Sequence, residues 1–282
     1  MRTESNTTIG AANVHWRREG EGPSIVFVHG FPLSGQTWSG VIHELRDRFT
    51  CYALDLIGLG ESHSPTDEDY SSPGQARVLR RALEVLGAGT YALVGNDTGG
   101  WVARELALID RHRISHLVLT NTEIPGHRPP WIPTYQALAH VPGFGTVLRQ
   151  FMKIPGFLAS PLAFGGCFQD ASVIEGDFRE RYVEPLLERG QALDGVLRFL
   201  RCMKFTRLDE LRTLHAELTM PTLFIWGADD PTFPESLARS MAAQFPNVAG
   251  FKTITEAKLF FHEEQPRAVA ELITGFLTGT SD

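Results

Sequence analysis

The stretch TYALVGNDTGGWVARELALID, residues 90–110, decides the fold because its pattern changes from strand to helix around a single aspartate. Residues 91–94 form a short apolar run, and apolar residues recur at helical spacing from Gly100 onward. Gly95 and Gly99 lie two positions before and after Asp97. Small residues at these places allow a sharp turn that holds the central side chain above a sheet. The stretch therefore predicts a strand, a tight turn that presents the Asp97 carboxylate, and a helix.

This turn leaves two interpretations of Asp97. A carboxylate presented in this way can attack a saturated carbon and form an alkyl ester, which suits substrates with a leaving group or a strained ring. In the other interpretation, the turn is an ordinary glycine-rich one and Asp97 only caps the helix that follows. A motif this short does not decide between the two interpretations, and other motifs of the chain are needed to choose one of them.

Strand-like and helix-like patterns alternate on both sides of this turn. The predicted strands are residues 10–17, 24–30, 51–56, 91–94, 116–123, 221–227 and 248–254, and the predicted helices include 38–48, 74–86, 234–245 and 265–277. Continuous β-branched and aromatic runs such as SIVFVHG are typical of strands that are buried on both faces of a parallel sheet. The alternation predicts an α/β fold with a doubly wound, mostly parallel sheet.

Residues 124–220 differ from the rest of the chain. They contain many prolines and aromatic residues, and they show short helical patterns without strands. Such a segment between two strands of a sheet predicts a helical cap that lids the site. We therefore expect residues 1–123 and 221–282 to form the core and residues 124–220 to form the cap.

Composition narrows the classes of partner. Charged residues make up 21% and hydrophobic residues 43% of the 282 residues, which is usual for a globular protein. The net charge of -7 and the lack of a basic patch predict no nucleic-acid partner. No apolar run reaches the roughly 20 residues of a membrane span, so we expect a cytoplasmic protein with no membrane partner. We expect no cofactor and no metal, because the loop at residues 57–62 lacks the context of a dinucleotide site and no ligand cluster is visible.

Four motifs follow one another along the chain: HGFP at residues 29–32, DLIGLGES at 55–62, the Asp97 turn, and WGADD at 226–230 with Pro234 beyond it. With them the chain resembles the α/β-hydrolase superfamily, and within it the branch with an aspartate nucleophile that holds epoxide hydrolases and haloalkane dehalogenases. The resemblance spans roughly residues 20–280 apart from the cap, where only helical character matches.

The resemblance implies a role for several residues. Asp97 would be the nucleophile, and Asp230 would be the acid that orients a histidine. The backbone N–H groups of Phe31 and Thr98 would form an oxyanion hole. Glu123 matches the place where some dehalogenases keep their acid, although a solvated loop carboxylate would explain it equally well.

The stretch AKLFFHEEQP, residues 257–266, departs from the family pattern. The resemblance requires a histidine about seven residues before Pro266, and the chain has Leu259 there. Without a base that activates water, an ester on Asp97 would form once and persist.

Several explanations of this departure stay open. In the first explanation, another residue is the base in place of the missing histidine; the candidates are His262, His127 and Glu123. Alternatively, Asp97 never forms a bond to carbon and transfers protons in an elimination, isomerisation or cyclisation. In a third explanation, Leu259 was introduced into the sequence in order to trap the ester on Asp97.

The residues around the turn favour one substrate class. Haloalkane dehalogenases place a tryptophan directly after the nucleophile, and many place an asparagine where this chain has Phe31; here the residue after the nucleophile is Thr98. Both halide donors are therefore missing, which weighs against cleavage of a carbon–halogen bond unless Trp131 or Trp38 takes their place. Epoxide hydrolases favour the HGFP motif and use cap tyrosines to protonate the opening oxygen. The candidates for substrate contact, which packing alone would also explain, are Trp38, Trp131, Tyr135 and Tyr182.

The sequence thus predicts a hydrolase that opens an epoxide, or less strongly a carbon–halogen bond, of an apolar small molecule with Asp97. Two other functions stay open. One is a lyase, isomerase or cyclase that uses Asp97 as a general acid or base. The other is a degenerate hydrolase that only binds a small ligand.

Overall fold

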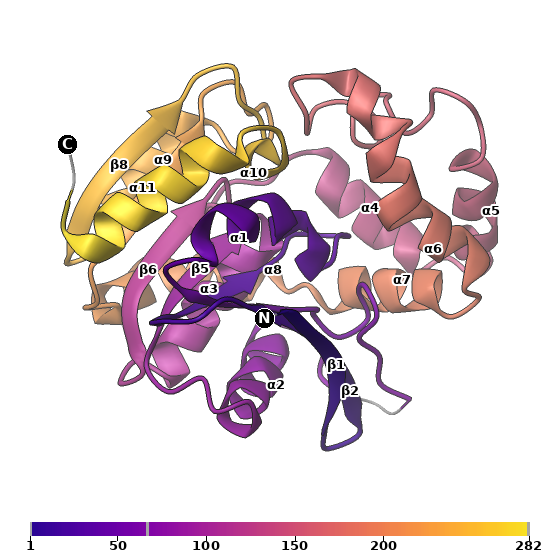
Figure 1. Ribbon diagram of the computed structural model, residues 1–282. Helices are drawn as coiled ribbons and strands as arrows, with labels where there is room; N and C mark the ends of the chain where they lie inside the picture. Colours follow the sequence, from indigo (N-terminus) through magenta and orange to yellow (C-terminus); the bar gives the residue numbers. More distant parts are fainter. Residues whose placement is uncertain (1, 66–67, 281–282) are drawn as a thin grey trace.

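A single sheet forms the centre of the computed structural model, which describes residues 2–65 and 68–280 (Figure 1). Its eight strands lie in the order β1-β2-β4-β3-β5-β6-β7-β8. The first two pairs in this order are antiparallel and the other five are parallel. The strands are β1 (Arg2–Ile9), β2 (Ala12–Glu19), β3 (Ser24–Val28), β4 (Thr50–Leu54), β5 (Tyr91–Asn96), β6 (Ile114–Thr120), β7 (Thr222–Gly227) and β8 (Val248–Ile254). The predicted doubly wound, mostly parallel sheet is confirmed.

Helices cover both faces of this sheet. The α-helices are α1 (Ser39–Leu45), α2 (Ser72–Val85), α3 (Thr98–Ile109), α4 (Trp131–Ala139), α5 (Phe144–Phe151), α6 (Glu184–Glu188), α7 (Ala192–Cys202), α8 (Phe205–Leu214), α9 (Glu235–Ala242), α10 (Phe261–Glu264) and α11 (Pro266–Thr278). Shorter helical turns are η1 (Gly35–Trp38), η2 (Ala171–Ile174), η3 (Arg179–Val183) and η4 (His215–Glu217). In the part of the chain that the structure describes, no helix combines the length and the apolar character needed to cross a bilayer.

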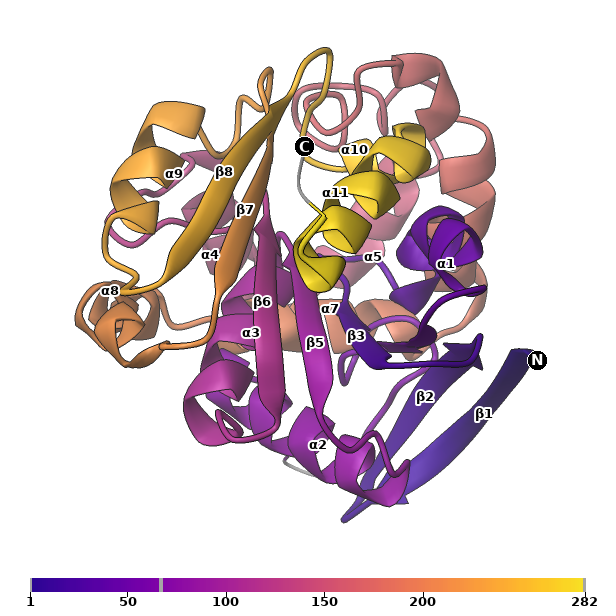
Figure 2. The ribbon, with the colours of Figure 1, turned by 60° about the vertical axis from the view of Figure 1, so that its left-hand side comes forward.

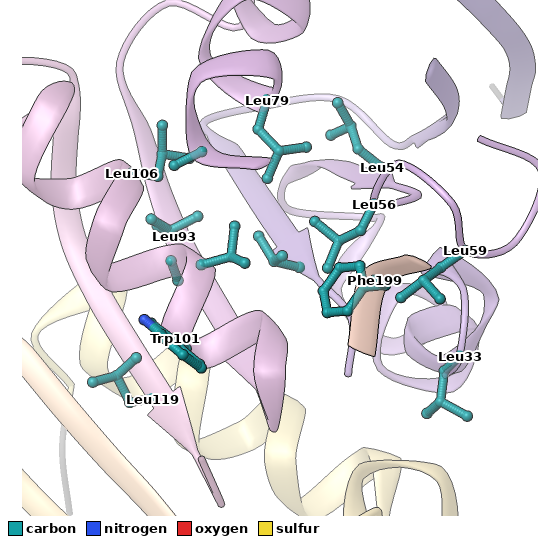
Figure 3. Packing of buried hydrophobic residues seen from close by; sticks show 14 of the residues in the cluster. Leu33, Leu54, Leu56, Leu59, Leu79, Leu93, Trp101, Leu106, Leu119 and Phe199 are labelled. Carbon is teal, nitrogen blue, oxygen red and sulfur yellow. The ribbon is translucent and has the colours of Figure 1, made fainter. Parts of the chain in front are cut away.

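Neighbouring residues of β5 show how the two faces are filled. Val94 packs with residues of α1 and α11, whereas Leu93 packs with residues of α2 and α3, because successive strand residues point to opposite faces. Figure 2 shows α11 and α3 on opposite sides of the sheet. Figure 3 shows Leu93 in the larger cluster with Trp101 of α3, and Phe199 of α7 joins the same cluster. The helices after β6 are thereby tied to the core.

The N-terminal edge of the sheet differs from the sequence prediction. Residues 10–17 were expected to form one edge strand, but the structure has a hairpin in which β1 pairs with β2 from Arg2 opposite Glu19 to Ile9 opposite Ala12. The sequence of β1, RTESNTTI, is polar and most of its residues are exposed or half-buried. A mostly exposed edge strand lacks the alternation of apolar and polar residues by which strands are identified in a sequence, so this strand was not predicted.

The chain between β6 and β7 is helical. In Figure 1, α4, α5, α6 and α7 lie together to one side of the sheet. Helix α8 instead lies against α3, since Arg207 forms an ion pair of 2.8 Å with Glu105 and the ring of Phe205 lies 5.8 Å from that of Trp101. The division into core and cap at residues 124 and 220 stays a prediction, and α8 is a part of that segment that packs on the core.

Gly99 permits the close contact between α3 and β3. A Cβ atom at this position would lie 2.3 Å from the Val28 carbonyl oxygen and 2.4 Å from that of His29. We expect Gly99→Ala to lower the free energy of unfolding by about 3 kcal/mol, because the backbone of β3 would have to move. Urea unfolding measures this change. The matched control is Gly190→Ala, where a Cβ would meet nothing within 4 Å; an equal loss in the two variants would contradict the prediction.

Candidate active site

The turn at Asp97 is a strained bend that its neighbours hold in place. β5 ends at Asn96 and α3 begins at Thr98, and Asp97 between them has φ 50° and ψ -134°. A positive φ is uncommon for a residue other than glycine. The Asp97 N–H donates to the Asn121 carbonyl oxygen at 2.8 Å, and the Asp97 carbonyl oxygen accepts from Thr122 Oγ1 at 2.8 Å. The chain just after β6 thus fixes this bend.

The Asp97 carboxylate is held by the loop after β3. The Phe31 N–H donates to Asp97 Oδ2 at 2.8 Å. A Cβ atom at Gly30 would lie 2.8 Å from the same oxygen, so only glycine fits beside it. The Asp97 side chain makes no hydrogen bond that caps α3. The helix-cap interpretation of Asp97 is therefore wrong, and the predicted contact with the HGFP loop is present.

A cavity of about 190 Å³ opens at this turn, and most of its lining is apolar. Core residues form one side of it, and residues of the segment between β6 and β7 form the other, among them Leu148, Met152 and Leu193. The residues singled out from the sequence that line it are Phe31, Asp97, Thr98, Glu123, Trp131, Tyr135, Tyr182 and Leu259. An apolar cavity with a few polar groups is typical of a small-molecule site.

Two carboxyl groups share this cavity. Asp97 is 7% exposed and Glu123 is 2% exposed. Glu123 Oε1 accepts from Thr98 Oγ1 at 2.7 Å, and Glu123 Oε2 lies 3.1 Å from Thr122 Oγ1. Burial raises the pKa of both carboxyl groups, and the charge of Glu123 raises that of Asp97 further. Glu123 is therefore not a solvated loop carboxylate, and it belongs to the site.

Arg104 of α3 supports the chain beneath this pair, and no motif in the sequence pointed to it. Its guanidinium is fully buried and donates to the Glu123 carbonyl oxygen at 2.7 Å, to Thr122 Oγ1 at 3.2 Å and to the Gly100 carbonyl oxygen at 3.1 Å. Burial lowers its pKa to about 10, so it stays charged at neutral pH. A buried cation with these partners fixes the backbone from which Glu123 extends.

Asp230 lies beyond the end of β7 and is anchored by amides. Its Oδ1 accepts from the Thr232 N–H at 2.8 Å, and its Oδ2 accepts from Nδ2 of Asn121. Burial raises the pKa of Asp230 to about 6 although these hydrogen bonds oppose the change. The Asn121 side chain also accepts from the Gly227 N–H at 2.7 Å. Asn121 thus links Asp230 to the Asp97 turn, and no motif in the sequence pointed to it.

His262 and Trp38 lie away from the cavity, so their predicted roles as a catalytic residue and a substrate contact are wrong. Both side chains are fully buried, and their rings stack with centroids 4.3 Å apart. His262 Nε2 lies 2.7 Å from Thr37 Oγ1, and burial lowers the pKa of His262 to about 3. The beginning of α10 turns His262 toward the core that α1 and α11 cover, where it packs as a neutral ring.

The other candidate histidine is also engaged elsewhere. His127 Nε2 lies 2.8 Å from the Thr232 carbonyl oxygen, and His127 is not among the residues that line the cavity. Leu259 does line it, and its carbonyl oxygen accepts from Asn96 Nδ2 at 3.0 Å. Position 259 thus faces the same cavity as Asp97, but with an alkyl side chain.

Cys167 is a lining residue that sequence reasoning left out. Its thiol is buried, and burial together with the charges of Asp230 and Asp97 raises its pKa well above the usual value. It is therefore a neutral, weakly nucleophilic group at neutral pH. Its isolated position in the sequence carried no signal that it would reach the site.

Comparisons with known proteins match this fold along most of the chain. Haloalkane dehalogenase 2 from Mycobacterium tuberculosis (strain ATCC 25618 / H37Rv) is 29% identical over 262 residues, which cover 92% of this chain and 90% of that protein. Epoxide hydrolase 4 from Mus musculus is 25% identical over 268 residues, which cover 90% and 73%. The crystal structure of the Cif epoxide hydrolase from Acinetobacter nosocomialis is similar with a TM-score of 0.79 at 20% identity, covering 98% of this chain and 89% of that one.

The family model described as alpha/beta hydrolase fold matches residues 23–265, a range that includes the HGFP loop, the Asp97 turn and β7. A match over this much of the sequence agrees with the strand order and with the position of the Asp97 turn. The chain belongs to the α/β hydrolase fold family.

Proposed function

We propose that the protein is a hydrolase that opens an epoxide, or a carbon–halogen bond, of an apolar small molecule with Asp97 as the nucleophile. The observation that carries this proposal is the hydrogen bond of 2.8 Å from the Phe31 N–H to Asp97 Oδ2 at the wall of an apolar cavity. When one oxygen of Asp97 bonds to carbon, the other becomes the carbonyl oxygen of the ester. The Phe31 N–H is then placed to stabilise the charge that develops on that oxygen when water attacks the ester.

The side chains around Asp97 favour the epoxide over the halide. Thr98 Oγ1 already donates to Glu123 Oε1, and the ring of Phe31 lies 5.7 Å from that of Phe199. Neither side chain offers the N–H group that would hold a departing halide. The relatives named epoxide hydrolase and haloalkane dehalogenase make both chemistries reasonable for this fold. The two reactions therefore differ in how the leaving group departs: an epoxide oxygen stays attached to the substrate, whereas a halide ion is released.

The cap tyrosines are less suited to proton donation than the sequence suggested. The Tyr135 hydroxyl donates to the Leu162 carbonyl oxygen, and the Tyr182 hydroxyl donates to Glu263 Oε1 at 2.8 Å. Burial and the charge of Glu263 raise the pKa of Tyr182 well above its usual value. We keep both as residues that contact the substrate.

A second candidate function rests on the two carboxyl groups. Asp97 and Glu123 share the cavity, and no histidine is among the residues that the structure shows lining it. An acid and a base of this kind can move protons within a substrate, as a lyase, isomerase or cyclase does. Such a reaction gives a product without an oxygen atom from water, which mass spectrometry of the product detects.

The intact mass of the protein after incubation with bromohexane tests the proposed function. We expect a gain of one hexyl group per chain, located on the peptide that contains Asp97, and no gain in the Asp97→Asn variant. Styrene oxide serves as the second reagent, for which we expect release of the diol. If neither an adduct nor a hydrated product forms, Asp97 is not a nucleophile toward these carbons. A rearranged product without an adduct would support the second candidate.

His262→Asn distinguishes a packing role from a catalytic one. Because His262 is fully buried behind the site, we expect a loss of about 1–2 kcal/mol in the free energy of unfolding. The rate of Asp97 alkylation by bromohexane should stay within roughly threefold of the original protein, since no group in the cavity changes. Urea unfolding and intact mass give the two values. A large fall in alkylation rate in folded protein would return His262 to the site.

A further inference from the structure

The surroundings of Thr122 show where the proton of the carboxyl pair lies. Thr122 Oγ1 has three polar neighbours: the Asp97 carbonyl oxygen at 2.8 Å, Glu123 Oε2 at 3.1 Å and Nη2 of Arg104 at 3.2 Å. A hydroxyl group has one proton to donate and two lone pairs that accept. The carbonyl oxygen only accepts and the guanidinium only donates. Thr122 Oγ1 therefore donates its proton to the Asp97 carbonyl oxygen, because these two oxygens lie 2.8 Å apart and would repel each other without a proton between them.

The contact between Thr122 Oγ1 and Glu123 Oε2 then lacks a proton unless Glu123 supplies it. A protonated Glu123 donates from Oε2 to Thr122 and accepts at Oε1 from Thr98 Oγ1, which satisfies both of its oxygens. It also gives Thr122 a complete set of one donated and two accepted hydrogen bonds. This arrangement leaves no buried oxygen pair in repulsion.

The hydrogen bonds around the pair, and not its charges, decide this placement. Two ionised carboxylates in an apolar cavity repel each other, so the pair holds one proton. The backbone hydrogen bond from the Phe31 N–H favours the ionised form of Asp97. The donors of Arg104 go to the Glu123 carbonyl oxygen and to Thr122 and not to the Glu123 carboxyl group, although the charge of Arg104 lowers the pKa of Glu123. Asp230, the other nearby carboxyl group, adds negative charge that raises the pKa of Asp97.

We infer that Glu123 is protonated in the resting protein and acts first as the acid and then as the base in opening an epoxide. The inference rests on the proposed function, since it needs Asp97 as the nucleophile. It assigns to Glu123 the two proton transfers for which the cavity offers no histidine.

The proton transfers balance over one reaction cycle. An oxygen of Asp97 attacks an epoxide carbon, the carbon–oxygen bond of the ring breaks with its electron pair on oxygen, and that oxygen takes the proton of Glu123. The product is a hydroxyalkyl ester of Asp97 beside an ionised Glu123. Glu123 next removes a proton from water, and the hydroxide adds to Cγ of Asp97. The bond from Cγ to the alkyl oxygen then breaks, which leaves Asp97 as a carboxylic acid beside a protonated Glu123. The departing alkoxide takes one of these two protons, and the other stays on the pair as at the start.

This proton placement selects the substrate class. A halide leaves as an anion and takes no proton, so Glu123 is still protonated after a haloalkane has reacted. A protonated carboxyl group cannot accept a proton from water. The ester from a haloalkane should therefore accumulate at neutral pH, whereas the ester from an epoxide should be hydrolysed. The site is matched to epoxides.

Glu123→Gln is a close mimic of the protonated residue. Its amide oxygen can accept from Thr98 Oγ1 and its NH₂ group can donate to Thr122 Oγ1, but it cannot release a proton. We expect it to unfold at the same temperature as the original protein to within about 2 °C, since the hydrogen-bond pattern is kept. The two reagents then report separately on nucleophilic attack and on proton transfer.

The test compares the rates at which bromohexane and styrene oxide modify Asp97, by intact mass and product analysis. In Glu123→Gln we expect the bromohexane rate to stay within roughly threefold and the styrene oxide rate to fall about 100-fold or more. An unchanged styrene oxide rate would overturn the inference, and so would an equal loss with both reagents, which indicates a structural role. If the original protein reacts with bromohexane but Glu123→Gln is unaffected toward both, the proposed function stands without this inference. If the original protein reacts with neither, both fail.

Discussion

Asp97→Asn is expected to lower the rate of epoxide opening by about 10⁴-fold or more, because an amide is a poor nucleophile toward carbon. The fold should be kept, since asparagine tolerates a positive φ and its side-chain oxygen can accept from the Phe31 N–H. Diol formation from styrene oxide, measured by chromatography at neutral pH, gives the rate. Retention of more than a small fraction of activity would contradict the assignment of Asp97.

The same substitution should stabilise the protein in a pH-dependent way. The pKa of Asp97 is raised in the folded state mainly by burial, and the carboxyl groups of Glu123 and Asp230 raise it further whenever they are ionised. Between the ordinary pKa of 3.8 and the raised one, the folded state binds more protons than the unfolded state, so stability falls as pH rises through that range. The Asp97→Asn variant has no titratable group at position 97, so its stability lacks this part of the fall with rising pH.

Urea unfolding at several pH values measures the difference. The advantage of Asp97→Asn should be largest at pH values above the raised pKa and should disappear below the ordinary pKa of 3.8. Asp229→Asn is the matched control, because Asp229 is an exposed residue in the loop that follows β7. An advantage that is the same at all pH values would show that relief of backbone strain, and not the buried charge, is its cause.

Leu259→His is expected to turn a single reaction with bromohexane into repeated turnover. Leu259 lines the cavity together with Asp97, so an imidazole at this position would lie where it can accept a proton from water. The hexyl ester that accumulates in the original protein should then be hydrolysed about 100-fold faster or more. Gas chromatography of hexanol measures the release.

Leu259→Phe is the control for this experiment, because it places a ring in the cavity without a proton acceptor. We expect it to retain the ester as the original protein does. If Leu259→His also retains the ester, a base at this position is not what the site lacks. Release of hexanol by both variants would mean that a change of shape at position 259 is sufficient.

Local motifs made the core of this site predictable. The turn that presents Asp97 lies within one continuous stretch of strand, glycines and helix, and its partner Phe31 lies in a short loop that ends a strand. Each pattern can be interpreted without knowing what packs on it. The place of Thr98 follows directly from that of Asp97.

Residues whose role depends on distant packing were not predictable. Whether His262 faces the cavity or the core depends on its contacts with Thr37 and Trp38, which lie more than 200 residues away in sequence. Asn121 and Arg104 act through hydrogen bonds to chain segments that only the fold brings together. Neither residue type has a spacing that would reveal such a role.

A single turnover in water enriched in heavy oxygen tests most directly whether Asp97 is a nucleophile. With the protein in excess over styrene oxide, the oxygen added to the diol should be the ordinary isotope, because it comes from the Asp97 carboxylate. The heavy isotope should then be found in the peptide that contains Asp97, since water attacks Cγ of the ester. A first-turnover diol that carries the heavy isotope, with Asp97 unlabelled, would contradict the covalent mechanism.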